Sequence, residues 1–431
     1  MQASVSSASG NSASATHAYS VDASAPTLTI NTIASDDILN ATEAGSPLTI
    51  SGTSTAETGQ TVTVTLNGAT YSGNVQADGS WSVSVPPSAL GALTASNYTV
   101  SATVNDKAGN PGSTSHNLAV DTTAPVLTIN TVAGDDIIND AEHAQALVIS
   151  GTSSGGEAGD VVSVVLNGKT YTSTLDASGN WSVGVPAADV TALGSGAQTI
   201  TASVSDRAGN SDDASRTVTV SLSAPVISIN TIAGDDVINA TEKGSDLTLS
   251  GTSDQPAGTA ITVTLNGQNY SATTDASGNW SVTVPASAVS ALGEATYSVT
   301  ASVTNAQGNS STASHNVQVN TALPGVTINP VATDDIINAA EAGSAQTISG
   351  QVTGAAAGST VTVELGGKTY TATVQADLSW SVSVPAADWQ ALGNGELTVN
   401  ASVTNAVGNT GSGTRDITID ASLPGLRVRA G

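Results

Sequence analysis

Hydrophobic and polar residues alternate in short runs along most of the chain. Residues 22–121 hold seven such runs, rich in Val, Ile and Thr: TLTINT, PLTISGT, TVTVTLNG, TYSGNVQ, WSVSVP, YTVSATVN and HNLAVD. Alternation with a period of two is typical of strands that turn one face toward a core. Seven strands in about 100 residues predict an immunoglobulin-like β-sandwich.

The dipeptide between the third and fourth runs predicts a tight hairpin. Asn67-Gly68 tolerates the positive φ angles of a type I′ turn. Gly168 and Gly267 occupy the same place further along the chain, and Gly366-Gly367 permits the same geometry. We therefore expect this hairpin four times.

The whole pattern repeats along the chain at intervals of 99 or 100 residues. A proline recurs at Pro26, Pro125 and Pro225 in an APxxxIN context and at Pro324 in the related context LPxxxIN, and Pro424 begins another copy. The WSVxVP segment carries Trp81, Trp181, Trp280 and Trp380. A tetrapeptide that closes with Gly-Asn ends at Asn110, Asn210, Asn309 and Asn409. Such a period indicates tandem structural units.

The repeats predict an all-β chain of tandem seven-stranded immunoglobulin-like β-sandwiches, arranged end to end as a rod. Repeats 1 to 4 are expected at residues 22–121, 122–220, 221–320 and 321–420. Residues 1–21 align with the C-terminal part of a preceding repeat, and residues 421–431 with the start of a following one. The recurring tryptophan alternates with polar Ser82, so we expect it in the core; the alternative is a sugar-stacking platform.

The charge balance is strongly acidic. Lys and Arg number 9 against 35 Asp and Glu, giving a formal net charge of −26. This charge argues against binding to nucleic acid or anionic membranes, and makes divalent cations the natural counter-ions. The chain has no cysteine, and no apolar run approaches the length of a membrane span. The Ser/Ala-rich first residues lack the basic and apolar regions of a signal peptide.

An acidic pair and a glutamate follow the first predicted strand of each repeat. In a sandwich of alternating strands, that loop lies at the C-terminal end of its repeat, whereas the Gly-Asn loop lies at the N-terminal end. Head-to-tail stacking should therefore bring Asp36, Asp37 and Glu43 toward the loop that holds Asp206, with the connector residue Asp121 between them. Converging carboxylates repel one another without a cation, and calcium accepts six to eight oxygen ligands in irregular geometry.

The candidate calcium ligands are Asp22, Asp36, Asp37, Glu43, Asp106, Asp121, Asp135, Asp136, Glu142, Asp206, Asp235, Asp236, Glu242, Asp334, Asp335, Glu341 and Asp420. Zinc would need His or Cys, and the four histidines cannot supply a site. His17, His116 and His315 share one repeat position with Arg216 and Arg415, which fits an exposed strand face.

The alternative interpretation of the acidic segment is a capped helical turn. Asn40 would be the N-cap, with Glu43 three residues later. The recurrence of the acidic pair and the glutamate in all four copies favours calcium. The first junction keeps Asp121 and Asp206, whereas the later ones have Ser221 with Asn305 and Asn320 with Asn405. We therefore expect calcium to bind most tightly at the first junction.

The motifs APVLTINTVAGDDIINDAE, WSVGVP and SDRAGN resemble the bacterial immunoglobulin-like repeats of giant type I-secreted adhesins and biofilm-associated proteins of Gram-negative bacteria. The resemblance covers essentially the whole chain. It implies a cell-surface protein with many such repeats, rigidified by calcium, with the acidic-pair and connector aspartates as ligands. It further implies partners reached through the parent protein: a host-cell glycan or protein receptor, or the biofilm matrix.

Three classes of function can be compared on residue inventory. An enzyme is disfavoured because the chain has no Cys, no His paired with Ser and Asp, and no Gly-rich phosphate loop. A monomeric, non-catalytic spacer fits the repeats best. A glycan- or protein-binding module would find its best support in Trp389, which replaces Leu90, Val190 and Val289 of the other repeats. Homotypic cohesion is opposed by the negative charge unless calcium screens it.

Overall fold

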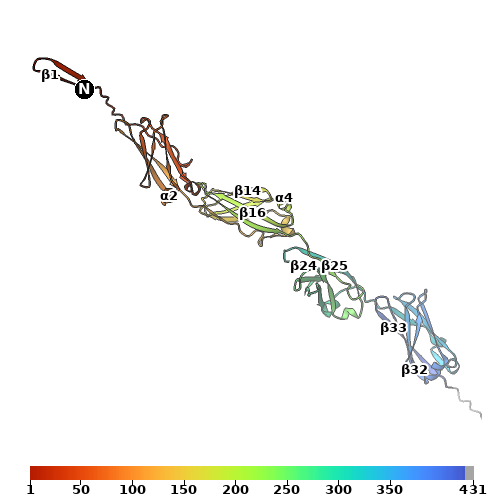
Figure 1. Ribbon diagram of the computed structural model, residues 1–431. Coiled ribbons are helices and arrows are strands. Elements are labelled where there is room, and N and C mark those ends of the chain that lie inside the picture. The colour runs from red at the N-terminus through yellow and green to blue at the C-terminus, as the bar shows by residue number, and fades with distance from the viewer. Residues whose placement is uncertain (423–431) are drawn as a thin grey trace, which may run out of the picture. The chain divides into compact units, whose positions relative to one another are not determined.

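The computed structural model describes residues 1–422 and consists mainly of antiparallel β-sheets. Its contacts divide the chain into two compact units, Met1–Leu222 and Ser223–Gly431. Each unit holds two β-sandwiches, and Figure 1 shows that each sandwich is formed by one continuous stretch of the chain. Within the described residues, no helix is long and apolar enough to cross a membrane.

The first unit begins with an isolated hairpin and continues with repeats 1 and 2. The hairpin comprises β1 (Gln2–Ser6) and β2 (Ser12–Thr16). Repeat 1 comprises β3 (Ile38–Leu39), α1 (Ala41–Ala44), β4 (Leu48–Thr53), β5 (Thr61–Leu66), β6 (Ala69–Asn74), β7 (Ser80–Val85), α2 (Pro87–Leu90), β8 (Asn97–Asn105) and β9 (Pro111–Val120). Repeat 2 comprises β10 (Val126–Leu127), β11 (Ile137–Ile138), α3 (Asp140–His143), β12 (Leu147–Ser154), β13 (Val161–Leu166), β14 (Lys169–Thr174), β15 (Asn180–Val185), α4 (Ala187–Thr191), β16 (Gly196–Ser205) and β17 (Ser211–Val220).

The second unit contains repeats 3 and 4. Repeat 3 comprises β18 (Ile227–Ile229), β19 (Val237–Ile238), the 3-10 turn η1 (Glu242–Gly244), β20 (Leu247–Ser253), β21 (Ala260–Leu265), β22 (Gln268–Thr273), β23 (Asn279–Val284), α5 (Ala286–Ser290), β24 (Thr296–Thr304) and β25 (Ser310–Val319). Repeat 4 comprises β26 (Gly325–Ile328), η2 (Val331–Thr333), β27 (Ile336–Asn338), α6 (Ala339–Ala342), β28 (Gln346–Thr353), β29 (Thr360–Leu365), β30 (Lys368–Thr373), β31 (Ser379–Val384), α7 (Ala386–Ala391), β32 (Gly395–Thr404) and β33 (Thr410–Asp420).

The same strand order recurs in repeats 2, 3 and 4, and repeat 1 differs in having only β4 and β7 in its second sheet. Repeat 2 has a five-stranded sheet, β11-β17-β16-β13-β14, facing a three-stranded sheet, β10-β12-β15. The short strand β11 runs parallel to β17, with Ile137 opposite Thr219, while the other pairs are antiparallel. This two-sheet arrangement confirms the predicted class of tandem immunoglobulin-like sandwiches.

The first predicted strand of repeat 1 is less regular than its sequence suggests. Leu28 forms only an isolated bridge to Ser54, although Thr29 N–H and Asn31 N–H donate to strand β4 at 2.9 Å. The chain then crosses to the other sheet and adds β3, which pairs in parallel with β9. The run TLTINT therefore bonds to β4 without forming a full strand.

Each repeat has its own hydrophobic core around one tryptophan. Trp81, Trp181, Trp280 and Trp380 are between 1% and 3% exposed, which confirms the inward orientation. A glycine on the neighbouring strand makes room for each ring: a Cβ on Gly151 would lie 2.6 Å from Trp181 Cζ2 and 1.9 Å from Thr128 O. The predicted hairpins are also confirmed, because Asn67 and Gly68 both have positive φ, 51° and 78°.

The ends of the chain were predicted to belong to neighbouring repeats. Strands β1 and β2 pair only with each other, from Gln2 opposite Thr16 to Ser6 opposite Ser12, and all their residues are exposed. The assignment of residues 1–21 to a preceding repeat stays a prediction. The predicted start of a following repeat, residues 421–431, lies almost entirely outside the described residues.

Candidate functional site: the junctions between repeats

The second aspartate of each acidic pair holds the loop to its own repeat. Asp37 has a positive φ of 67°, a conformation that Asp tolerates better than most residues. Its Oδ1 accepts a hydrogen bond from Ile33 N–H at 2.8 Å and lies 2.7 Å from Nε2 of His116 on β9. The acidic loop is thus tied to the last strand of the sandwich.

The cationic partner of that aspartate alternates along the chain. His116 and His315 pair with Asp37 and Asp236 in repeats 1 and 3, whereas Arg216 and Arg415 pair with Asp136 and Asp335 in repeats 2 and 4. The expectation that these His and Arg residues only occupy an exposed strand face is therefore wrong. Their side chains are between 27% and 30% exposed, because each lies against the acidic loop.

These pairs stabilise the charged form of the aspartates. Hydrogen bonding to the Arg216 guanidinium is the main reason why the pKa of Asp136 lies below its ordinary value, and Arg415 lowers the pKa of Asp335 in the same way. In repeat 3, the Ile232 N–H contributes most to the lowered pKa of Asp236, followed by His315. The even-numbered repeats thus hold this loop with a permanent charge.

A second charged contact is found in repeats 2 and 4. Asp189 accepts hydrogen bonds from Lys169 Nζ and from Tyr171 Oη, the latter at 2.9 Å, and Asp388 binds Lys368 and Tyr370 in the same way. Burial, together with the neighbouring carboxylate, raises the pKa of Tyr171 to about 12. Repeats 1 and 3 have alanine in place of these aspartates, at positions 89 and 288.

The Asn and Glu of each acidic segment form the capped turn that was the alternative interpretation. Asn40 Oδ1 accepts from Glu43 N–H at 2.9 Å, while Glu43 Oε2 accepts from Asn40 N–H at 3.1 Å. The same reciprocal bonds join Asn139 with Glu142, Asn239 with Glu242, and Asn338 with Glu341. The first aspartate of each pair also accepts a backbone N–H two residues later, as Asp36 does from Ile38 at 3.0 Å.

In the first unit, the capped turn of repeat 1 meets the Gly-Asn loop of repeat 2. Asn210 Oδ1 accepts a hydrogen bond from Ala41 N–H at 2.8 Å, and Asn210 Nδ2 donates to the connector carbonyl of Asp121 at 3.0 Å. Asn40 Nδ2 donates to Ala208 O at 3.1 Å. The two loops therefore meet as predicted, but through amide groups.

The junction between repeats 3 and 4, inside the second unit, is built in the same way. Asn409 Oδ1 accepts from Ala240 N–H at 2.7 Å, and its Nδ2 donates to Asn320 O at 2.8 Å. Both junction asparagines are buried, Asn210 to 6% exposure and Asn409 to 2%. From the sequence, the Gly-Asn loop was placed at the junction, but its asparagine was assigned no contact; the presence of this asparagine in all four repeats was the available signal.

The predicted calcium ligands mostly hold local turns. Asp22 and Asp121 accept backbone N–H groups two residues later, at 3.0 and 3.1 Å, and Asp420 accepts from Ser422. Asp106 and Asp206 accept from the Gly-Asn asparagine of their own repeat. Among residues 1–422, no three His, Asp or Glu side chains are placed together to hold a metal ion. The ligand assignment therefore stays a prediction.

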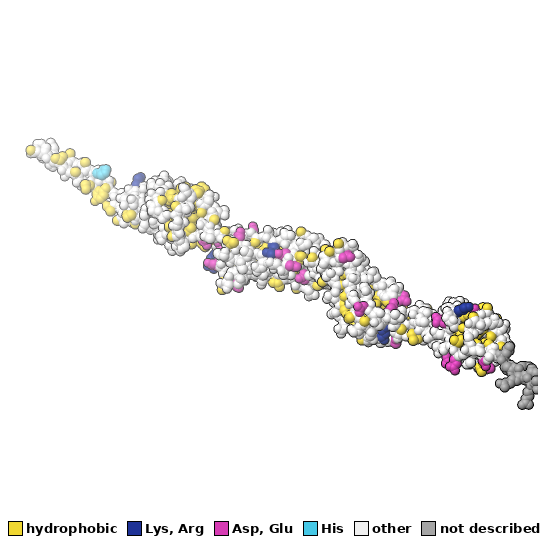
Figure 2. Space-filling view, turned by 90° about the horizontal axis from the view of Figure 1, so that it is seen from below, with side chains coloured by type: hydrophobic (Ala, Val, Ile, Leu, Met, Phe, Trp, Pro, Cys, Tyr) yellow, Lys and Arg dark blue, Asp and Glu magenta, His cyan; other side chains and the backbone are white. Residues whose placement is uncertain are grey.

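A hollow of about 530 Å³ lies at the junction between repeats 1 and 2. Asp121 lines it from the connector, while Glu157 and Arg207 line it from repeat 2. Arg207 lies 3.8 Å from Glu157, in an exposed ion pair. Figure 2 shows acidic side chains at several places on the face that it presents, mostly beyond the first sandwich, and few basic ones. Such an acidic excess favours cations.

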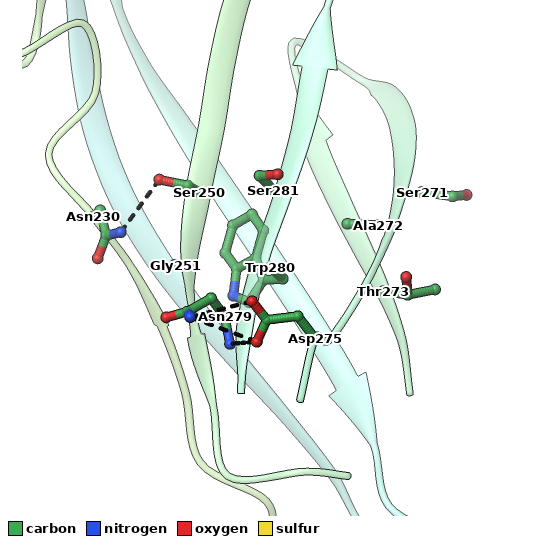
Figure 3. Close-up of a pocket in the computed structure, with 10 residues that line it drawn as sticks. All are labelled: Asn230, Ser250, Gly251, Ser271, Ala272, Thr273, Asp275, Asn279, Trp280 and Ser281. Atoms are coloured by element: carbon green, nitrogen blue, oxygen red, sulfur yellow. Dashed lines mark hydrogen bonds between the residues drawn. The ribbon is translucent and has the colours of Figure 1, made fainter. Parts of the chain in front are cut away.

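A second hollow, of about 630 Å³, lies in repeat 3 between the edge strands β22 and β23. Figure 3 shows Trp280 with Asp275 and Asn279, whose side chains are joined by hydrogen bonds. The Trp280 ring is only 2% exposed and offers no face for stacking a sugar. Trp389, the best support for a binding module, is fully buried at 0% exposure, so that support fails.

Comparisons with known proteins agree with this architecture. A family model described as a bacterial Ig-like domain matches residues 31–122, 127–222 and 223–321. The comparison with curated proteins gave no significant match.

Three solved structures are similar to the chain in sequence. One is a Ca²⁺-stabilised adhesin that helps an Antarctic bacterium reach out and bind ice: it is 37% identical, with 93% of this chain and 100% of that one covered and a TM-score of 0.44. Another is a 1.5-MDa bacterial ice-binding adhesin: it is 32% identical, with 70% and 100% covered and a TM-score of 0.41. The third is a tetra-tandem repeat from the extending region of a large adhesion protein: it is 26% identical, with 92% and 100% covered and a TM-score of 0.37.

The family match spans more than half of the chain, and the matched ranges contain the capped turns and Gly-Asn loops of repeats 1 to 3 and nearly all of their sheets. The fourth sandwich, which lies outside these ranges, repeats the same strand order. The chain belongs to the bacterial immunoglobulin-like domain family.

Proposed function

We propose that this chain is a non-catalytic spacer segment of a large bacterial cell-surface adhesin, stiffened by calcium at its junctions. In this role it extends an adhesive part of the parent protein away from the cell, toward a host receptor or a biofilm matrix. Export through a type I apparatus belongs to the same proposal.

One observation carries the proposal: the same two loops meet at both described junctions through the same hydrogen bonds. Ala41 N–H binds Asn210 in the first unit, and Ala240 N–H binds Asn409 in the second. A module that binds its neighbour the same way each time builds a linear array of fixed geometry. Such an array serves as a spacer, and the family's occurrence in large adhesins supports this role.

Calcium is the cation whose chemistry fits the first junction best. The hollow there is lined by carboxylates of Asp121 and Glu157, with connector backbone groups beside them. Oxygen donors without His or Cys suit calcium rather than zinc. Asp121 and Glu157 would hold the ion and supply its negative charge. Asp206, whose two carboxylate oxygens bind Asn210, and the other predicted acidic residues are further candidates. Asp37 and Asp136 would become ligands only by leaving His116 and Arg216.

Small-angle scattering of the whole chain, with calcium and then with chelator, tests this function. We expect a long, narrow particle whose flexibility increases when the metal is removed. An unchanged scattering profile would refute stiffening by calcium. Sedimentation under both conditions distinguishes cohesion between chains, which would increase the mass, from a change of shape alone.

The chain supplies its own control for the ligand assignment. Replacing Asp121 and Asp206 together by Asn gives the first junction the residues that Asn320 and Asn405 provide in the second unit. Calorimetry should then show loss of the tightest calcium-binding event. An unaltered affinity would exclude these two aspartates as ligands.

A further inference from the structure

The Gly-Asn asparagine joins three pieces of the chain with one side chain. In the first unit, Asn210 accepts from Ala41 of the preceding repeat and donates to Asp121 O of the connector. Its own backbone N–H and its Nδ2 also bind Asp206, at 2.8 and 2.9 Å. Both polar atoms of the Asn210 carboxamide therefore have partners. The position of this side chain depends on both repeats.

The same contacts persist where the carboxylates are missing. In the second unit, the connector residue is Asn320 and the loop residue is Asn405, yet Asn409 makes both inter-repeat bonds at 2.7 and 2.8 Å. Asn405 Oδ1 replaces the aspartate as acceptor for Asn409 N–H at 2.9 Å. The junction bonds thus require an amide at this position and do not require the acidic residues that a cation would need.

Repeat 1 shows the asparagine held by internal bonds alone. Asn110 makes the internal bonds of its counterparts, with Asp106 Oδ1 and Oδ2 at 2.8 Å and with Asp22 O at 3.2 Å. In the described part of the chain, no donor reaches its Oδ1. The acceptor is therefore held in place by its own repeat and its connector.

The glycine before the asparagine allows the close approach. Gly209 and Gly408 have φ angles of 87° and 82°, which favour glycine. A Cβ on Gly408 would lie 3.0 Å from Nδ2 of Asn239, whose Oδ1 accepts the Glu242 N–H in the turn of the preceding repeat. The Gly-Asn dipeptide therefore fits closely against the Asn-Ala sequence that begins the capped turn of the preceding repeat.

We propose that this asparagine and the capped turn of the preceding repeat form a cation-independent clamp, which fixes the orientation of adjacent repeats. The docking surface is the Gly-Asn loop, and its partner is the first N–H of an Asn-Ala-x-Glu turn on another repeat of this kind. The proposal deepens the spacer function and rests on it. Calcium would add stiffness to a junction that hydrogen bonds have already oriented.

Distance measurement across the first junction tests the clamp. Because the chain has no cysteine, spin labels can be attached to Ser84→Cys on β7 and Thr201→Cys on β16, both exposed positions. The whole chain is measured by pulsed electron resonance in excess chelator, so that calcium cannot contribute. The parent should give one narrow distance distribution.

Two substitutions remove the clamp from opposite sides. Asn210→Ala deletes the side chain, whereas Ala41→Pro deletes only the donor N–H. Proline is well tolerated at the first helical position, and Asn40 already has the extended backbone that a following proline requires. Each lost hydrogen bond should shift the equilibrium toward misaligned repeats by about fivefold. Both variants should therefore broaden the distribution.

Asn110→Ala is the matched control, because it removes the same internal bonds without touching the labelled junction. It should leave the distribution unchanged. A narrow, parent-like distribution in Ala41→Pro and in folded Asn210→Ala would overturn the proposal. If scattering shows no effect of calcium while both variants broaden the distribution, the calcium part of the proposed function fails and the clamp stands.

Discussion

Replacing Arg216 by alanine should selectively destabilise one edge of repeat 2. The guanidinium binds both carboxylate oxygens of Asp136, at 2.7 and 2.6 Å. It also donates to Ile129 O at 2.9 Å and to Thr131 Oγ1 at 3.0 Å. These four bonds connect β17 to the segment that follows β10 and to the acidic loop, and alanine can replace none of them.

The size of the expected destabilisation follows from how deeply the Arg216–Asp136 ion pair is buried. The side chains of Arg216 and Asp136 are 29% and 28% exposed. Exposed ion pairs contribute about 0 to 1 kcal/mol, and losing one partner of a buried pair costs about 3 to 5 kcal/mol. A half-buried bidentate pair should lie between these limits, at about 1 to 3 kcal/mol. That loss corresponds to a roughly 5- to 150-fold change in a local opening constant.

Hydrogen exchange detected by mass spectrometry can localise this loss in the whole chain. In the Arg216→Ala variant, amides of the acidic loop should exchange roughly 5 to 150 times faster. One of them is Val132 N–H, which donates to Asp136 Oδ1 at 2.9 Å. Arg207→Ala removes the same charge from the same repeat, but its side chain is 78% exposed and its ion pair is long at 3.8 Å. It should change exchange by about twofold at most. Equal effects of the two variants, or an effect spread over all repeats, would refute the reasoning.

Two further predictions concern the same repeat. Because Arg216 lowers the pKa of Asp136, the ion pair stabilises the folded repeat fully above pH 3.8, the ordinary pKa, and this stabilisation is lost as the pH falls through the lowered pKa of the folded state. NMR titration of the Asp136 carboxyl group should find a midpoint below 3.8. An unshifted midpoint would contradict the pairing. Gly151→Ala should destabilise repeat 2 by about 3 kcal/mol, because the added Cβ meets backbone and the Trp181 ring; in denaturant unfolding, Gly184→Ala, with nothing within 4 Å of its Cβ, is the control and should be near neutral.

Most of the fold could be predicted because its signals are local. Alternating residues specify which face of a strand is buried, so the inward position of Trp81 followed from its neighbours. The hairpin at Asn67 followed from the positive φ angles that a type I′ turn requires. The irregular first strand was harder to predict, since residues 27–32 bond to β4 before the chain changes sheets.

The roles of the acidic residues could not be predicted from spacing alone. Asp37 contacts His116, which lies 79 residues away, only because β3 pairs in parallel with β9. The alternation of His and Arg is visible in the sequence, but its meaning depends on that pairing. The alternating direction of the strands correctly predicted which loops meet. It could not show that Asn210, rather than the carboxylates, makes the contact.

Amide hydrogen bonds and carboxylates at the junctions should respond differently to salt, acid and cations. Asn210 and Asn409 are uncharged and buried, so their bonds should respond weakly to salt and to mild acid. Carboxylates such as Asp121 respond to cations, and their arrangement differs between the two described junctions, since the second has Asn320 instead. If orientation depends on amides and added stiffness on carboxylates, each repeat can dock in the same geometry while its response to calcium varies. Substitution at residue 121 should therefore alter calcium dependence without altering the orientation of repeat 2, whereas Ala41→Pro, which removes only the donor N–H, should alter the orientation without altering calcium dependence.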